Sequence, residues 1–308
     1  MSNHSPACGR YAPSPTGVLH AGNLRTALAA WASARSKGLR FLLRVEDIDG
    51  PRCDSRIEAQ QLADLNLLGI DWDEPPLRQS KRIDIYTKHF RALTKTEAVY
   101  PCFCSRKEVA EALSAPHGPS SNAYPGTCAS LSPDEVQIRM REGRTHCWRL
   151  RVRRAPKFFH DEFMGDVEID LEKDGGDFVI RRADGLYSYQ FVCAVDDSLT
   201  GITEVVRADD LLDSGLRQSW TLNKLYLPAP TYYHIPLMHG ANGSRLAKRE
   251  KSDGLAAILS RGKTIDQFRG ALAASLGQCE VDEPITMSEL ARRWDWAKVP
   301  PGVSIWKG

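Results

Sequence analysis

One short stretch near the amino terminus combines residue types that could bind a phosphate group. GRYAPSPTGVLHAGNLRTAL (residues 9–28) passes from an apolar run through a Pro-Ser-Pro turn into a helical pattern, with His20 and Gly22 at the junction. A helix N-terminus presents unpaired N–H groups and a partial positive charge, and glycine allows a ligand to approach the backbone. The junction therefore predicts a nucleotide or phosphate site, although a histidine there can also be purely structural. Neither a Walker A sequence nor G-x-G-x-x-G is present.

A second candidate for anion binding lies far along the chain. GSRLAKREK (residues 243–251) carries Arg245, Lys248 and Arg249 in a glycine-containing loop before a helical pattern. Charged surface loops are common, so this loop alone is weak evidence. Beside a nucleotide site at the same sheet edge, however, it could stabilise phosphates during transfer.

Three of the eight cysteines fall in a short region and indicate a metal site. Cys102 and Cys104 form a C-x-C pair, and Cys128 follows. Tetrahedral zinc takes four ligands, and either His117 or Tyr124 could be the fourth; the alternative is three free, buried thiols. A site of this kind would be structural, because it would hold a loop-rich segment that lacks its own core. We expect ordinary packing roles for the remaining cysteines, Cys8, Cys53, Cys147, Cys193 and Cys279.

The elements that would position these residues alternate between strand and helix. Residues 9–13 and 41–47 have the pattern of strands, and residues 24–37 and 55–68 have helical spacing, with Gly38 and Gly69 as stops. Strand–helix–strand–helix order predicts an α/β fold with a doubly wound parallel sheet. Ligands of such sheets bind outside the carboxyl ends of the strands.

The alternation breaks in the middle of the chain, which indicates an insertion. From about residue 100 to 156 come cysteines, prolines and a basic run. Alternation resumes in segments 178–197 and 202–212, where we expect strand ends near Tyr189 and Arg207; a helix over 214–226, a strand over 232–239 and a helical C-terminal region follow. The predicted division is 1–99 and 178–255 for the two halves of the α/β domain, 100–177 for an insertion that would bind zinc and contact the polyanionic acceptor, and 256–308 for the C-terminal helices.

Composition narrows the class of protein. The 308 residues are 42% hydrophobic and 26% charged, which is typical of a globular protein. We find no apolar run long enough to span a bilayer and no secretory signal pattern, so we expect a cytoplasmic protein without a membrane partner. The basic run predicts contact with a polyanion, its alternative being a solvated face. Its cations are Arg139, Arg141, Arg144, Arg149, Arg151, Arg153, Arg154 and Lys157.

These motifs together resemble the class I aminoacyl-tRNA synthetases. His20-Ala21-Gly22-Asn23 resembles the H-x-G-H signature, and residues 245–249 resemble the K-M-S-K-S loop; each is degenerate, at Asn23 and at Ala247. Residues 10–17 (RYAPSPTG) and 44–49 (RVEDID) are similar to the glutamyl branch. The resemblance covers roughly residues 9–255 and implies a Rossmann-like catalytic domain.

Within that branch, the chain resembles the glutamyl-Q tRNA(Asp) synthetases, which consist of the catalytic domain without an anticodon-binding domain. The resemblance implies ATP-dependent activation of L-glutamate as glutamyl-adenylate, with Mg²⁺, and transfer to the queuosine nucleoside at the wobble position of tRNA(Asp). The alternative is a glutamyl-tRNA synthetase that charges a tRNA 3′ end. More distant alternatives are a nucleotidyltransferase that binds no RNA and a zinc-stabilised RNA-binding module with an inactive site. We expect a monomer.

The resemblance also assigns residues to roles. His20 and Lys248 would be catalytic. ATP would contact His20, Gly22, Asn23, Arg245 and Lys248, with Arg249 as a further cation. The glutamate pocket would comprise Arg10, Tyr11, Ala12, Pro13, Ser14, Glu46, Tyr189 and Arg207, with Tyr187 as an alternative to Tyr189. One zinc ion per chain would be held by Cys102, Cys104, Tyr124 and Cys128.

Overall fold

A five-stranded parallel sheet forms the centre of the molecule. The computed structural model describes residues 7–114, 123–244, 255–260 and 262–306. The strand order is β10-β9-β1-β2-β3, and all neighbours are parallel. The strands are β1 (Cys8–Tyr11), β2 (Arg40–Val45), β3 (Leu77–Arg78), β9 (Glu204–Ala208) and β10 (Thr231–Ile235). Because β2 lies on one side of β1 and β9 on the other, the order reverses between β1 and β9, where ligands of such sheets bind.

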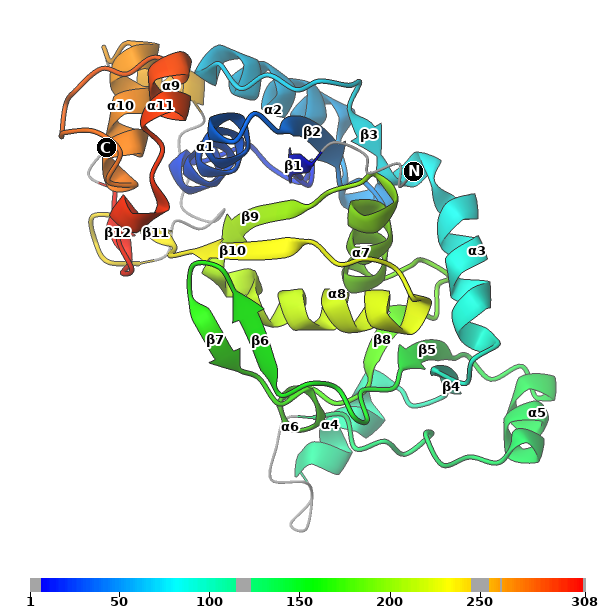
Figure 1. The fold of residues 1–308 in the computed structure, drawn as a ribbon. Coiled ribbons are helices and arrows are strands. Elements are labelled where there is room, and N and C mark those ends of the chain that lie inside the picture. Colours follow the sequence, from blue (N-terminus) through cyan, green and yellow to red (C-terminus); the bar gives the residue numbers. More distant parts are fainter. Residues whose placement is uncertain (1–6, 115–122, 245–254, 261, 307–308) are drawn as a thin grey trace, which may run out of the picture.

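Helices cover both faces of this sheet, as the predicted doubly wound fold requires (Figure 1). One face carries α1 (Ala21–Ser36) and α2 (Ser55–Leu68), with the C-terminal helices α9 (Leu255–Leu259), α10 (Ile265–Ser275) and α11 (Met287–Arg293) beyond them. Six buried alanines in α1 allow it to pack closely on the sheet. The other face carries α3 (Ile83–Thr94), α7 (Tyr189–Leu199) and α8 (Leu212–Leu225), which share a second hydrophobic core. The sheet therefore has a separate core on each side.

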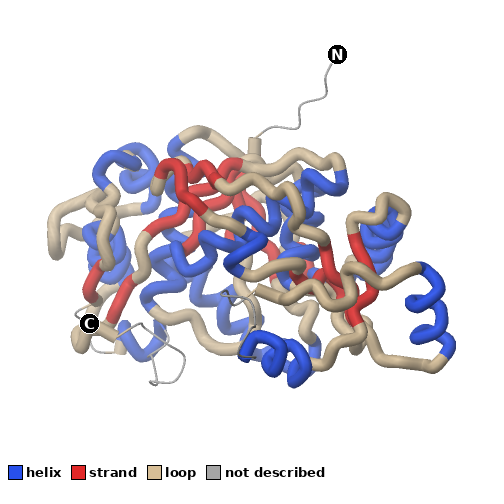
Figure 2. Tube along the Cα trace, turned by 90° about the horizontal axis from the view of Figure 1, so that it is seen from below, coloured by secondary structure: helices blue, strands red, loops and turns tan. Residues whose placement is uncertain are grey.

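The predicted insertion folds as its own layer. Strands β4 (Val99–Cys102), β5 (Cys147–Leu150) and β8 (Phe178–Arg181) form an antiparallel sheet, with helices α4 (Arg106–Ser114), α5 (Pro133–Arg141) and α6 (Leu171–Asp174). A hairpin of β6 (Phe158–Asp161) and β7 (Gly165–Glu168) returns to the central sheet and lies against β10. In Figure 2 the sheet of β4, β5 and β8 lies toward the right of the view, apart from the central strands.

The C-terminal region is fastened to the central domain. Strand β11 (Met238–His239) pairs with β12 (Ser304–Ile305). The buried Arg25 of α1 donates hydrogen bonds to the Pro236 carbonyl at 2.7 Å, the Ser275 hydroxyl at 3.0 Å and the Ser304 hydroxyl at 3.1 Å. One guanidinium thus joins three segments that are distant in sequence. Short 3₁₀ helices complete the described chain: η1 (Gly50–Arg52), η2 (Gln79–Lys81), η3 (Asp209–Leu211) and η4 (Trp296–Lys298).

Several predicted elements are confirmed, and two need correction. Helix 55–68 is α2 with its predicted bounds, but segment 178–197 is strand β8, a turn and helix α7. Tyr189 therefore begins a helix instead of ending a strand. Residues 191–197 of α7 are all buried, so no polar face marks their helical period. Strand β8 pairs with β5, which extends the insertion's sheet beyond residue 177. Strand 232–239 is interrupted at Pro236, which has no N–H to donate.

No helix in the described parts of the chain has both the length and the apolarity needed to cross a bilayer.

Candidate active site at the carboxyl ends of the central strands

A cavity of about 520 Å³ opens at the carboxyl ends of β1 and β9, where the strand order reverses. Its wall includes residues that the sequence assigned to glutamate binding and residues that it assigned to ATP binding. From the first come Arg10, Tyr11, Ala12, Pro13, Ser14, Glu46, Tyr189 and Arg207, and from the second His20, Gly22 and Asn23. The fold therefore brings the two predicted sites together in one cavity.

His20 caps the helix that points at this cavity. Its Nδ1 accepts a hydrogen bond from the Asn23 N–H at 3.3 Å, and the Asn23 side chain accepts one from the His20 N–H at 3.2 Å. This capping box fixes Nδ1 as an acceptor, so the neutral ring carries its proton on Nε2. A Cβ on Gly22 would lie 3.2 Å from the His20 ring, so glycine leaves room for that ring. The arrangement suits a phosphate beside the N-terminus of α1.

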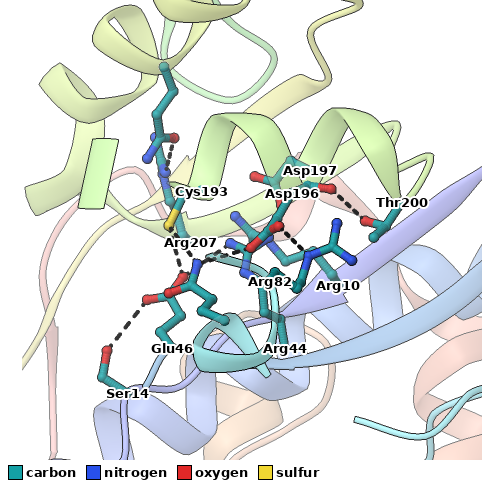
Figure 3. Close-up of polar contacts among 12 residues, drawn as sticks. Arg10, Ser14, Arg44, Glu46, Arg82, Cys193, Asp196, Asp197, Thr200 and Arg207 are labelled. Atoms are coloured by element: carbon teal, nitrogen blue, oxygen red, sulfur yellow. Dashed lines mark hydrogen bonds and ion pairs between the residues drawn. The ribbon is translucent and has the colours of Figure 1, made fainter. Parts of the chain in front are cut away.

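Buried charges of both signs line the floor of the site (Figure 3). The Arg10 Nε lies 3.3 Å from the Asp197 Oδ1, and Arg44 donates to that same oxygen. Burial alone would raise the pKa of Asp197, but Arg44 and Arg10 hold it below its usual value. One carboxylate therefore holds two guanidinium groups in place beneath the cavity.

Glu46 contributes a negative charge to the same wall. Its Oε1 accepts hydrogen bonds from Arg44 at 3.0 Å and from the Cys193 thiol at 3.1 Å, and its Oε2 accepts one from Ser14 at 3.4 Å. These contacts fix the carboxylate where a substrate ammonium group could reach it. Figure 3 shows Glu46 between Ser14 and Cys193.

Arg207 provides a buried cation at the end of β9. The Nε donates to the His234 Nε2 at 2.9 Å, the Nη1 to the Gln218 Oε1 at 2.8 Å and the Nη2 to the Leu211 carbonyl at 3.2 Å. Asp209 and Asp210 follow Arg207 closely in the sequence, but neither is among these contacts. The guanidinium is thus held by neutral groups.

The two candidate tyrosines, Tyr187 and Tyr189, lie in different environments. Tyr189 lines the cavity and is about one-third exposed. Tyr187 is buried in the second core, and its hydroxyl donates to Thr87 at 3.0 Å. Tyr187 lines an adjoining cavity of about 420 Å³, which Tyr189, Ser14 and Glu46 also line. Tyr189 therefore adjoins both spaces.

The cysteine cluster lies in the insertion, away from this cavity. Atoms of Cys102, Cys104 and Cys128 lie within 4.8 Å of one another. The Tyr124 hydroxyl is 3.2 Å from the Cys102 Sγ and 3.6 Å from the Cys104 Sγ, and the Cys104 and Cys128 sulfurs are 3.5 Å apart. Ligands at tetrahedral zinc, about 2.3 Å from the metal, would be separated by similar distances. Three thiols and a phenol oxygen therefore fit a structural zinc ion.

Further residues surround the cluster. Hydrogen bonds from Cys147 and then Tyr124 lower the pKa of the Cys102 thiol to about 4. The Arg149 guanidinium lies 3.7 Å from the centre of the Tyr124 ring, where it favours negative charge on the ligands. Cys147 is the residue that the C-x-C spacing missed, because only the pairing of β4 with β5 places it opposite Cys102.

Four of the predicted residues lie outside the described part of the chain. They are Arg245, Lys248 and Arg249 of the predicted loop, and His117.

Sequence reasoning also missed several buried partners of the site residues. The missed partners include Asp197, Arg44 and Cys193 around Arg10 and Glu46, and His234 and Gln218 around Arg207. Asp196 and Asp197 inside an apolar run were a usable signal, since buried acids need partners. Nothing in the spacing indicated His234.

The fold and a family model together define the class of protein. Residues 8–273 match the catalytic domain of the class I tRNA synthetases (E and Q). The structure is also similar to a glutamate-tRNA synthetase from Elizabethkingia anophelis, with a TM-score of 0.85 and 24% identity over 99% of this chain and 68% of that one. A glutamate tRNA ligase from Elizabethkingia meningosepticum, solved in complex with its amino acid, gives a TM-score of 0.84 and 25% identity over 98% and 67%.

Sequence relatives define the family more narrowly. A protein of Symbiobacterium thermophilum is 42% identical over 95% of this chain and 94% of its own length, and one of Nocardia farcinica is 43% identical over 95% and 90%. Both are named glutamyl-Q tRNA(Asp) synthetase. The chain belongs to this family.

Proposed function

We propose that the protein uses ATP to activate glutamate as glutamyl-adenylate and transfers the glutamyl group to the queuosine nucleoside at the wobble position of tRNA(Asp). One observation carries the proposal. Two guanidinium groups and one carboxylate, from Arg10, Arg207 and Glu46, line the cavity that also contains the N-terminus of α1. This set of charges complements an amino acid with two carboxylates and one ammonium group, placed beside a phosphate site.

Activation needs positioning and charge stabilisation rather than a side-chain nucleophile. An oxygen of the glutamate α-carboxylate attacks the α-phosphorus of ATP, and the bond to the bridging oxygen breaks, so pyrophosphate leaves with Mg²⁺. His20, Gly22 and Asn23 would hold the nucleotide at the helix N-terminus. Lys248, with Arg245 or Arg249, would stabilise the charge that develops on the leaving phosphates.

The amino-acid pocket uses charges that are already fixed. Arg10 and Arg207 would each receive a carboxylate, and Glu46 would receive the ammonium group. Tyr11, Ala12, Pro13, Ser14 and Tyr189 would enclose the remaining parts of the substrate. Because Asp197, Arg44 and Cys193 hold these groups before the substrate arrives, little ordering is required on binding.

The transfer step requires an RNA beside the adenylate. The adjoining cavity shares Ser14, Glu46 and Tyr189 with the main one. Arg182 lines this cavity and also a cavity of about 740 Å³ beside the cysteine cluster, whose wall includes Arg144 and Arg149. This run of cationic surface supports a path for the phosphate backbone of tRNA. In the second step, a nucleoside hydroxyl attacks the activated carbonyl and AMP leaves.

Zinc would act as a structural ion in the insertion. Cys102, Cys104, Tyr124 and Cys128 would hold it. The cluster of buried residues around them is small, so a metal would supply the stability that its core lacks.

A transfer assay with labelled glutamate tests the acceptor. tRNA(Asp) that contains queuosine should be labelled, and tRNA(Asp) that contains guanosine at the same position should not. A tRNA(Asp) without its 3′-terminal adenosine should still accept glutamate. Labelling that depends on the 3′ adenosine but not on queuosine would contradict the proposal and support the alternative, a glutamyl-tRNA synthetase.

A further inference from the structure

Arg207 is held in an orientation that leaves two donors for a ligand. A guanidinium carries five N–H groups. Among the described residues, one donor each on Nε, Nη1 and Nη2 is used by His234, Gln218 and the Leu211 carbonyl. One N–H remains on each terminal nitrogen, so each can donate to one oxygen of a bound carboxylate. The direction of that pair depends on what holds the Nε.

The contact to Nε fixes the protonation of a buried histidine. Since a guanidinium N–H can only donate, the His234 Nε2 must accept, and the proton of the neutral ring lies on Nδ1. The Nδ1 lies 2.6 Å from the Asp161 Oδ2, to which it donates. His234 and Asp161 are both fully buried. Burial lowers the pKa of His234, which agrees with a neutral ring.

Asp161 is itself fixed in the hairpin of the insertion. Its Oδ1 accepts hydrogen bonds from the backbone N–H groups of Met164 at 2.8 Å, Phe163 at 3.0 Å and His234 at 3.2 Å. The Phe159 ring of the same hairpin packs on His234, with the ring centroids 6.0 Å apart. The carboxylate thus has no freedom to turn away from the imidazole.

We propose that Asp161 and His234 are positioning residues for the amino acid: Asp161 holds the His234 tautomer whose Nε2 accepts from Arg207, and so aims the two terminal nitrogens of Arg207 at a substrate carboxylate. This inference rests on the proposed function, in which Arg207 binds glutamate. It means that the hairpin β6–β7 completes the amino-acid pocket although it lies outside the central sheet. A purely structural role would require the carboxylate but not a particular tautomer.

Asp161→Asn tests the tautomer with almost no change in shape. The amide oxygen can still accept from the three backbone N–H groups, but the amide nitrogen donates to Nδ1. The ring proton then moves to Nε2, where it faces the Arg207 N–H group. Glutamate-dependent ATP–pyrophosphate exchange should show a glutamate KM raised at least tenfold, with the KM for ATP unchanged and kcat reduced less than KM is raised.

Asp166→Asn is the matched control. Asp166 lies on the same hairpin and pairs with His160 at 2.7 Å, but both side chains are exposed. This variant should keep the wild-type glutamate KM. Nitrogen-15 NMR of the histidine rings adds a readout that needs no activity. His234 should be protonated at Nδ1 in the wild type and at Nε2 in Asp161→Asn.

Two results would contradict the proposed role of Asp161 and His234. An unchanged glutamate KM in Asp161→Asn, or a wild-type ring protonated at Nε2, would overturn the inference. If Asp161→Asn does not fold, His234→Gln, which retains an acceptor, should keep a KM near the wild-type value, and His234→Leu, which has none, should raise it. Equal KM values in these two variants would overturn the inference. If the wild-type protein shows no glutamate-dependent ATP–pyrophosphate exchange, the proposed function itself would be overturned.

Discussion

At the scale of single residues, the site is built from charges that other charges hold in place. Asp197 pairs with Arg10 and Arg44, and Arg44 also pairs with Glu46, all at buried positions. Arg10 and Glu46 could be predicted from the sequence because they lie in motifs. Asp197 carried a partial signal, because an acid inside an apolar run needs a partner, but the sequence did not name that partner. His234 and Asp161 could not be predicted, because their roles depend on contacts between segments far apart in the chain.

Arg10→Gln should raise the glutamate KM about a hundredfold, because a buried charge-assisted pair contributes about 3 kcal/mol. The KM for ATP should stay near its wild-type value. Glutamine is chosen over alanine to limit the cavity left beside Asp197. Arg40→Gln, on the neighbouring strand but paired with Glu74 at the surface, is the control and should have no effect. A normal glutamate KM in Arg10→Gln would remove Arg10 from the pocket.

His234 should make stability depend on pH. Burial lowers its pKa in the folded state below 6.5, although Asp161 opposes this shift. Below pH 6.5 the unfolded chain therefore binds a proton that the folded chain does not, and stability falls as the pH falls. Urea unfolding at pH 7 and pH 5 should show a smaller difference for His234→Gln than for the wild type. If the two proteins lost the same stability between pH 7 and pH 5, the pKa of His234 would not be lowered by folding, and the buried ring would be charged at pH 5.

At the scale of elements, sequence patterns predicted the helices whose two ends carry capping or stop residues. Asp54 caps α2, and Gly69 ends it in a left-handed conformation at φ 93°, so both ends carried a local signal. Helix α7 carried none, because it is buried along most of its length. Cys147 likewise joins the cysteine cluster only through strand pairing.

The capping box of α1 allows a structural effect to be separated from a catalytic one. His20→Ala should lower the free energy of unfolding by about 1 kcal/mol through loss of the cap. It should also reduce the rate of adenylation. Thr264→Ala removes the corresponding cap of α10 and should cost similar stability without any loss of rate. Equal rates in the two variants would restrict His20 to the cap.

The proposed zinc site can be tested without an activity assay. Cys104→Ser should lower the zinc content from one ion per chain to nearly none, whereas Cys279→Ser should leave it unchanged, since Cys279 lies outside the cluster. Chelation should speed hydrogen exchange in β4 and β5 and leave β1 and β9 protected, because β1 and β9 also pack in the first core, which contains no residue of β4 or β5. Full zinc content in Cys104→Ser would contradict the assignment.

At the scale of the whole molecule, the fold places one cavity where the two halves of the parallel sheet meet. The first core fastens the C-terminal helices to α1, and the second joins the insertion to α3, α7 and α8. The sequence predicted this doubly wound plan and the insertion. The return of the β6–β7 hairpin to β10 depends on long-range packing, and no periodicity indicated it.

The central claim is that this cavity activates glutamate by itself. Its most direct test is ATP–pyrophosphate exchange with glutamate and no RNA, with aspartate and glutamine as controls. We predict exchange with glutamate alone, because the charges that would bind it are already in place without RNA. Absence of exchange until tRNA is added, or equal exchange with aspartate or glutamine, would contradict this account.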